Sequence, residues 1–190
     1  MAVTANLVIR QRVTMMVNRF EIEREGQSGL AGFIEQKRMK LREEVVMYAD
    51  ETKSSVVATM KAETIIDMAA RNRVTAGDGT PLGAVRKEFG KSLLRSTLTV
   101  TGPDDELLGT AAERSPAVAI ARRISDFLPY GELIPWQFHF DLVAPDGETI
   151  ASIDRRRRLR DQYDVSFDED RLDWRLAALL GVAVDVFLGR

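Results

Sequence analysis

The residues of this chain with the clearest chemistry are basic, and they occur in short runs. The densest run is Arg155-Arg156-Arg157-Arg158, and two shorter runs are Lys37-Arg38-Met39-Lys40 and Arg86-Lys87. Guanidinium and ammonium groups donate several hydrogen bonds and pair well with phosphate or carboxylate oxygens. Anion binding is therefore the first chemistry to consider, and its candidate residues are Lys37, Arg38, Lys40, Arg86, Lys87, Arg155, Arg156, Arg157 and Arg158.

The cost of burying charge constrains where the arginine run can lie. In the middle of a half-buried strand, alternate side chains point inward, so half of the run would be buried. An unpaired buried charge is very costly, so we expect the run at a corner, a bulge or a strand end. Ion pairing is the alternative to anion binding, and the acidic neighbours in sequence are Glu43, Glu44, Glu88, Asp154 and Asp161.

A second chemical group is a cluster of carboxylates just before the apolar C-terminal segment. Its members are Asp161, Asp164, Asp168, Glu169, Asp170 and Asp173. Calcium binds through several carboxylate and carbonyl oxygens, which makes Asp164, Asp168 and Asp170 candidate metal ligands. Helix capping is the alternative, because Asp168 or Asp170 near a helix start complements the helix dipole.

Residues for covalent or acid–base catalysis are scarce. The chain has no cysteine, which excludes disulfides, thiolate zinc sites and cysteine nucleophiles. His139 is the only histidine, and no partner for it can be inferred from the sequence. Phosphate-loop, dinucleotide and nucleophile-elbow motifs are also missing. We therefore expect a protein that is not an enzyme and that needs no cofactor.

Composition and charge narrow the class of protein further. The 190 residues carry 27 basic and 29 acidic groups, a balance unlike that of a general nucleic-acid binder. Arg10, Arg12 and Arg19 interrupt the apolar residues near the N-terminus, so no secretory signal is predicted. No apolar stretch approaches the roughly 18 residues of a transmembrane helix. These patterns predict a cytoplasmic protein.

The elements that position these residues are mainly short strands. Apolar and polar residues alternate at 20–23, 97–101, 137–142 and 163–167, and this period of two is typical of half-buried strands. Asp78-Gly79 and Asp146-Gly147 predict hairpins with type I′ turns, because both residues tolerate positive φ. We expect about twelve strands between residues 7 and 167.

Two segments have helical patterns instead. Residues 115–128 place apolar side chains on one face, which predicts an amphipathic helix packed outside the sheet, or alternatively on a membrane surface. Residues 171–188 are apolar on every side around Leu176–Val184, so this helix must be buried. Its nine-residue apolar middle spans only about 14 Å, too short to cross a bilayer.

One sequence pattern occurs three times: a turn, a strand, a basic corner, a Leu-Arg pair and a second strand. Leu41, Leu94 and Leu159 occupy the equivalent position in the three copies. Repeated hairpins in one sheet tend to curl and close. A barrel of about twelve strands leaves a core about as wide as a helix, about 10 Å. The sequence therefore predicts one mainly β domain over residues 1–190, a closed antiparallel barrel around helix 171–188 with helix 115–128 added outside.

With these elements in place, the chain resembles the LURP-one-related family, which is grouped with the Tubby C-terminal domain and the phospholipid scramblases. The resemblance is carried by Leu7-Val8-Ile9-Arg10-Gln11-Arg12, by Asp78-Gly79 followed by Leu82-Gly83, and by the ending Leu176 to Asp185. It implies a twelve-stranded barrel around a buried C-terminal helix. The opening is similar to a bacterial, actinobacterial branch of the family.

The resemblance also bears on function. Tubby domains bind phosphoinositides through basic residues, and scramblases place acidic residues just before their C-terminal helix, which implies a weak calcium site. We expect a binding or scaffold domain that recognises an anionic phospholipid or a phosphorylated ligand at the basic corners, peripheral to the inner membrane face. A scramblase-type lipid-active protein with weak calcium dependence and a protein–protein interaction module are the alternatives.

Overall fold

A computed structural model of the chain describes residues 4–13, 17–37, 44–63, 71–88, 97–114, 139–157 and 161–188. Within these residues the chain forms twelve strands and one helix. The strands are β1 (Thr4–Val13), β2 (Val17–Arg24), β3 (Gly32–Lys37), β4 (Glu44–Tyr48), β5 (Val56–Ala62), β6 (Arg71–Ala76), β7 (Pro81–Glu88), β8 (Thr97–Thr101), β9 (Leu107–Glu113), β10 (His139–Val143), β11 (Thr149–Arg157) and β12 (Asp161–Asp168), and the helix is α2 (Trp174–Leu188).

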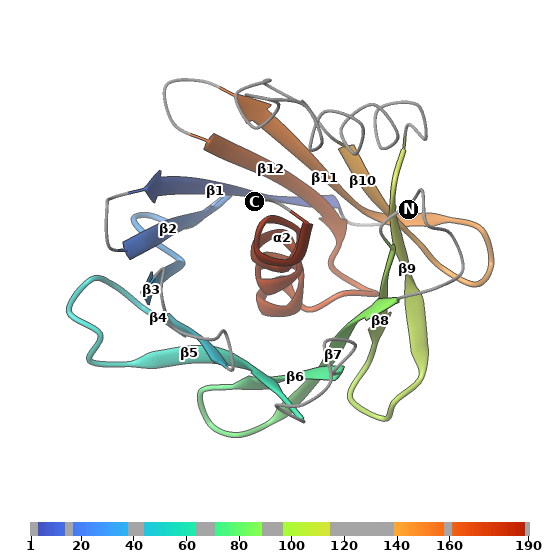
Figure 1. Cartoon of the computed structure of the whole chain (residues 1–190), viewed down its shortest axis with the longest axis horizontal. Coiled ribbons are helices and arrows are strands. Elements are labelled where there is room, and N and C mark those ends of the chain that lie inside the picture. The colour runs from blue at the N-terminus through green and yellow to red at the C-terminus, as the bar shows by residue number, and fades with distance from the viewer. Residues whose placement is uncertain are drawn as a thin grey trace, which may run out of the picture.

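All twelve strands belong to one closed antiparallel barrel, as the sequence predicted (Figure 1). Each strand pairs with its neighbours in the chain, and the ring closes where β1 lies between β2 and β12. Closure leaves no strand edge open for pairing with another chain. The predicted outer helix, residues 115–128, lies outside the described residues.

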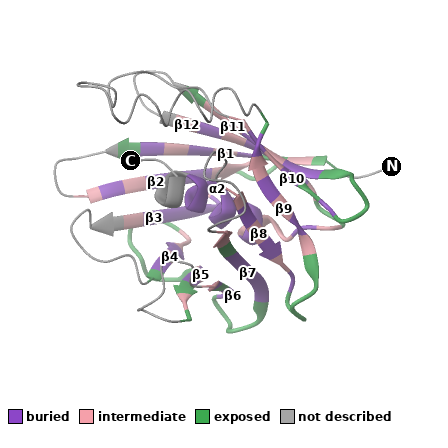
Figure 2. Ribbon diagram, turned by 45° about the vertical axis from the view of Figure 1, so that its right-hand side comes forward, coloured by how far each residue is buried: buried purple, intermediate pink, exposed green. Residues whose placement is uncertain are grey.

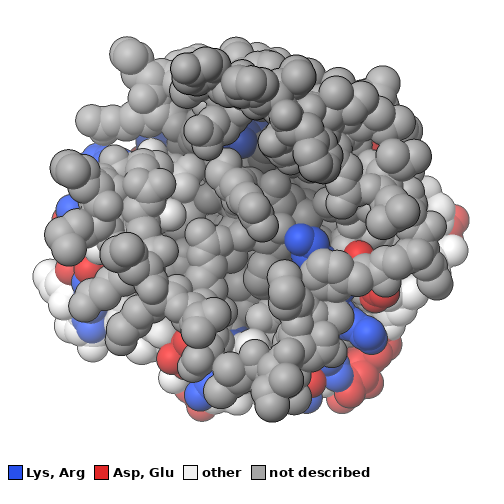
Figure 3. Space-filling model, in the orientation of Figure 1, with Lys and Arg blue, Asp and Glu red and all other residues white. Residues whose placement is uncertain are grey.

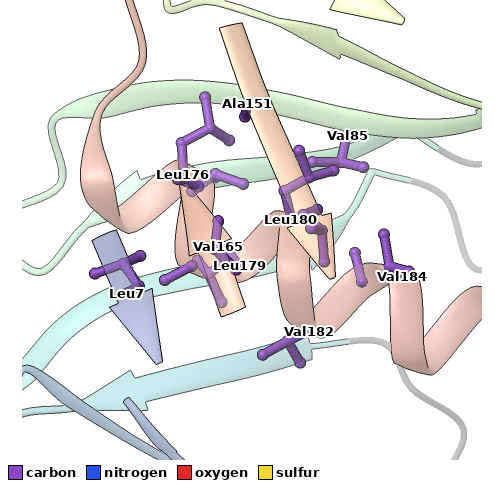
Figure 4. Packing of buried hydrophobic residues seen from close by; sticks show 14 of the residues in the cluster. Leu7, Val85, Ala151, Val165, Leu176, Leu179, Leu180, Val182 and Val184 are labelled. Carbon is purple, nitrogen blue, oxygen red and sulfur yellow. The ribbon is translucent and has the colours of Figure 1, made fainter. Parts of the chain in front are cut away.

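Helix α2 runs through the middle of the barrel (Figure 1). Leu179, Leu180 and Val184 expose none of their surface, and they pack against inward side chains of the barrel wall (Figure 4). Buried residues make up the described part of α2 and alternate with partly buried residues along strands such as β8 and β10 (Figure 2). Burying each large apolar side chain contributes about 1.5–3 kcal/mol. Among the described residues, no helix is long and apolar enough to cross a lipid bilayer.

Two glycines bring the helix and the wall close together. A Cβ on Gly181 would lie 2.8 Å from Cδ1 of Ile9 in β1. Gly83 in β7 has φ +137°, and a Cβ there would lie 2.1 Å from the backbone oxygen of Thr101 and 3.1 Å from Cδ2 of Leu176. Gly83 excludes a side chain because the Thr101 atom belongs to the backbone, whereas the Ile9 methyl next to Gly181 is the far end of a side chain and can shift.

The helix begins later than the sequence pattern predicted. Asp173 is its N-cap, because the Asp173 side-chain Oδ1 accepts a hydrogen bond from the Arg175 backbone N–H at 2.8 Å. The Asp173 carbonyl accepts the Ala177 N–H at 2.9 Å. The prediction that Asp168 or Asp170 caps the helix was therefore wrong. Asp168 instead accepts the Asp170 N–H at 3.1 Å in the preceding turn.

The predicted Asp-Gly hairpins are present, but their turn type differs. The Gly79 N–H donates to the Ala76 carbonyl at 2.9 Å, and of residues 77–79 only Gly79 has positive φ, +89°. Gly147 repeats the arrangement with the Ala144 carbonyl and φ +88°. A type I′ turn needs two residues with positive φ, so these are three-residue loops ending in one left-handed glycine.

Candidate anion-binding site at one rim of the barrel

The antiparallel meander brings the three basic runs to the same end of the barrel. Odd-numbered strands all run in one direction, so β3, β7 and β11 end at one rim, here named the basic rim. Lys37 is the last residue of β3, Arg86 and Lys87 precede the end of β7 by one or two positions, and Arg155 to Arg157 end β11. Arg38, Lys40 and Arg158 lie outside the described residues, as do the side chains of Lys37 and Arg157.

The three runs are spread evenly around this rim. Strands β3, β7 and β11 lie four positions apart in a ring of twelve, with three strands between each pair, so they divide the circumference into thirds. The runs therefore do not form one stripe on the outer wall.

Strand alternation divides the basic residues into inward and outward groups. Lys87 lies opposite the buried Leu98, and Arg155 lies opposite the buried Tyr163, so both side chains belong to the inner face. The neighbours Arg86 and Arg156 belong to the outer face. An arginine on the inner wall is tolerated here because it is at the strand end, where we expected the run, and because its guanidinium carbon lies 5.7 Å from the centroid of the Tyr163 ring.

The outward basic residues have different surroundings. Arg156 forms an ion pair with Asp164 at 2.5 Å, although 62% of the Arg156 side chain is exposed. The sequence alternative named Asp154 and Asp161 as partners, but Asp154 pairs with His139 at 2.5 Å. Within the described part of the chain, exposed Arg86 has no carboxylate at ion-pair distance. These outer cations are well solvated, so their interactions are weakened by water and salt.

Polar side chains line the inside of the barrel near the basic rim. Gln11, Asn18, Asn72 and Glu113 expose only 6%, 8%, 7% and 1% of their surfaces. They belong to the same inner face as Lys87 and Arg155. We name this set the polar collar, and its members are Gln11, Asn18, Asn72, Lys87, Glu113 and Arg155.

Sequence reasoning did not find the polar collar as a set. Its signal is an apolar alternation that turns polar at the strand end, as in Leu7, Ile9 and Gln11 of β1. That signal is short in each strand, and only the closed ring shows that the polar ends face one another.

A space-filling view shows where charged side chains lie on one face of the molecule (Figure 3). Basic and acidic side chains of the described residues are interspersed at the margin of this face, and basic atoms are also visible inward of that margin. On this face, the described residues therefore mix charges of both signs along the margin.

The three candidate calcium ligands are not gathered. Asp164 and Asp168 are four residues apart on β12, which separates them by about 13 Å along an extended strand. Asp164 accepts a hydrogen bond from Gln162 at 2.7 Å besides its ion pair with Arg156. In the described ranges, no group of three His, Cys, Asp or Glu side chains could hold a metal ion.

His139 lies on the outer face in a charged cluster. Asp141 binds the Arg114 guanidinium through both carboxylate oxygens, at 2.5 and 2.7 Å, and the Arg114 hydrogen bond lowers the pKa of Asp141 below its ordinary value of 3.8. The Ser152 hydroxyl donates to Asp141 at 2.8 Å rather than to His139. These side chains therefore interact as surface ion pairs do, and Ser152, His139 and the aspartates are not arranged as a Ser–His–Asp relay.

The opposite end of the barrel, here named the turn rim, holds the start of α2 in place. Arg171 forms ion pairs with Asp146 at 2.8 Å and Glu148 at 3.0 Å, in the turn between β10 and β11. The guanidinium of Arg24 lies 5.5 Å from the Trp174 ring centroid and also pairs with Glu169. An open pocket of about 400 Å³ lies beside this contact and is lined by Thr4, Ala5, Arg24, Glu25, Gly26, Gln27 and Glu169.

No protein-family model, curated protein or solved structure matches the chain. The class that the fold defines is a closed antiparallel barrel of twelve strands with one C-terminal helix. That architecture is consistent with a Tubby-like or LURP-one-related fold, although it does not identify one.

Proposed function

We propose that this protein is a non-enzymatic binding module that recognises an anionic group, either a lipid headgroup or a phosphorylated ligand, at the basic rim. The observation that carries the proposal is the shared direction of β3, β7 and β11, which puts Lys37, Arg86, Lys87 and the Arg155–Arg157 end at one rim. Several cations around one opening raise the local concentration of anions and supply donors for phosphate oxygens.

We also propose that the chain is a cytoplasmic, peripheral member of the LURP-one-related and Tubby-like group. A twelve-stranded closed barrel around a buried C-terminal helix is the architecture that the resemblance implied. In such a barrel the helix occupies the interior, so the rims and loops remain for recognition.

Vesicle flotation tests the proposed function. We expect wild-type protein to float with vesicles of phosphatidylcholine and phosphatidylglycerol, to bind less as salt rises, and to stay behind with phosphatidylcholine alone. Equilibrium dialysis with radiolabelled phosphate tests the soluble form of the same chemistry. The rim variant carries Arg86→Gln, Lys87→Gln, Arg155→Gln and Arg156→Gln, and we expect it to bind at least about tenfold more weakly.

A matched control loses the same number of charges elsewhere. It carries Arg10→Gln, Lys53→Gln, Arg73→Gln and Arg171→Gln, and each of these cations is ion-paired with a carboxylate. We expect this control to bind like the wild type once both variants are shown to be folded. Equal loss in both variants, or no binding of vesicles or phosphate by the wild type, would contradict the proposed function.

A further inference from the structure

We infer that the anion is an extended surface of anionic lipid headgroups, and that the barrel stands upright on it, with the basic rim against the surface and the turn rim pointing away. This inference rests on the proposed function and names the partner of the same site. It is carried by the opposite charges of the two ends of the barrel and by the spacing of the three basic runs.

The turn rim is strongly acidic. Its six connections hold twelve carboxylates and two cations, and they are residues 25–31, 49–55, 77–80, 102–106, 144–148 and 169–173. All of these residues are described, and eleven of the twelve acidic residues are exposed, the exception being half-buried Asp173. The connections therefore have a net charge of −10, and because the whole chain has −2, the remaining residues together carry +8.

The strand ends at the basic rim have the reverse balance. The last two residues of each odd-numbered strand and the first two of each even-numbered strand include seven Lys or Arg and four Asp or Glu. The charge therefore changes sign along the axis of the barrel. A molecule with this separation of charge is turned as it approaches a negatively charged membrane, so that its basic end arrives first.

The height of the barrel keeps the acidic end away from the surface in this orientation. Eight-residue strands such as β2, β7 and β12 are about 26 Å long, which gives a height of about 20 Å when strands tilt as they do in barrels. The Debye length in physiological salt is about 8 Å. An upright barrel therefore gains the attraction of its basic rim with little repulsion from its turn rim, whereas a barrel on its side would bring both to the surface.

The spacing of the basic runs also favours an upright position. Strands β3, β7 and β11 divide the ring into thirds, so each run can meet different headgroups and the attraction acts on all sides of the axis. The outward cations need no cavity for this contact. Arg86 is exposed, and 62% of the Arg156 side chain is exposed although it pairs with Asp164.

Energy transfer from two labels tests the orientation. The chain has no cysteine, so one introduced cysteine carries a dye at a single position. Thr97→Cys labels the partly exposed first residue of β8, at the basic rim, and Ser28→Cys labels the exposed turn between β2 and β3. With vesicles of phosphatidylcholine and phosphatidylglycerol that carry an acceptor on their headgroups, we expect stronger transfer from position 97. Equal transfer, or stronger transfer from position 28, would overturn the inference.

Two double variants with the same change in net charge test it a second way. Glu44→Gln/Glu88→Gln removes two carboxylates at the basic rim, and Glu51→Gln/Asp104→Asn removes two at the turn rim. In physiological salt we expect the first pair to strengthen vesicle binding at least about threefold, and the second to change it less than about twofold, because it lies beyond the reach of the surface potential. Equal strengthening by the two folded variants would show that the barrel has no fixed orientation.

The outcomes separate this inference from the proposed function. If the wild type binds phosphate in dialysis but no vesicles, the basic rim still binds anions and this inference fails. If vesicles bind but the two labels give equal energy transfer, the proposed function stands and the upright orientation is wrong. If the wild type binds neither vesicles nor phosphate, both proposals fail.

Discussion

The guanidinium of Arg155 lies over the ring of Tyr163, with its carbon 5.7 Å from the ring centroid, on the inner wall of the barrel near the basic rim. Tyr163 is fully buried, so the first member of the arginine run is attached to the core rather than to the surface. The next residue, Arg156, faces outward and pairs with Asp164. One strand end thus presents one cation to the mouth and the next to solvent.

The central position of α2 predicts that Leu180→Asp prevents folding. Leu180 exposes none of its surface, and an aspartate there would be a charge without a partner inside the barrel. Circular dichroism and thermal melting check this. Leu107→Asp is the control, because Leu107 exposes 48% of its surface and should tolerate the charge. A cooperative melt of the Leu180→Asp protein would show that the helix is not central.

Close approach at Gly83 predicts a large destabilisation by Gly83→Ala. A Cβ there would lie 2.1 Å from the Thr101 carbonyl oxygen, a backbone atom that cannot rotate away. The free energy of unfolding, measured with urea, should fall by about 3 kcal/mol or more, as for other strained core changes.

Gly29→Ala is the matched control for this prediction. Gly29 also has positive φ, +79°, but nothing lies within 4 Å of a Cβ at that position. Its cost should therefore be only that of the left-handed backbone, about 1 kcal/mol. Equal effects at both glycines would mean that backbone strain, and not the approach of Thr101, sets the cost.

The N-cap at Asp173 predicts a loss of stability at low pH. Burial raises the pKa of Asp173, but hydrogen bonds from the Arg175 side chain and backbone outweigh it, and the net pKa lies below the ordinary value of 3.8. The ionised carboxylate therefore stabilises the folded chain above the unfolded pKa. This contribution is lost as pH falls through the folded pKa.

Urea unfolding between pH 7 and pH 2 measures this contribution. Asp173→Asn keeps a capping oxygen and removes the charge, so its stability should change less across the acidic range than that of the wild type. Asp173→Ala should lose about 1 kcal/mol at neutral pH through the missing cap. An unchanged acid slope in Asp173→Asn would show that other carboxylates account for it.

The separation of Asp164 from Asp168 predicts that calcium leaves the folded domain unchanged. The two carboxylates are about 13 Å apart along one strand, and Asp164 is engaged by Arg156. Thermal melting with millimolar calcium, and again with a chelator, should give the same midpoint. A calcium-dependent rise that disappears in Asp168→Asn would instead support the alternative of a calcium-dependent lipid-active protein.

Much of the fold could be predicted because its signals are local. Alternation such as Phe138, Phe140 and Leu142 indicates a half-buried strand wherever its partners lie, and a segment apolar on all sides, such as Leu176–Val184, must be buried. These two patterns, the alternation of the strands and the all-apolar segment, predicted the twelve-stranded barrel with its buried C-terminal helix. The helix start was missed by three residues, because several aspartates in a row satisfy the same capping preference.

The candidate site depended on tertiary structure for a different physical reason. Sequence shows that Arg155 and Lys87 are basic, but the direction of each side chain depends on the register of its strand with a partner tens of residues away. Likewise, Asn18 and Arg155 share a mouth only because β1 closes the ring against β12. Residue types and spacing thus determine which chemistry the chain carries, while pairing and closure decide which of those groups face one another.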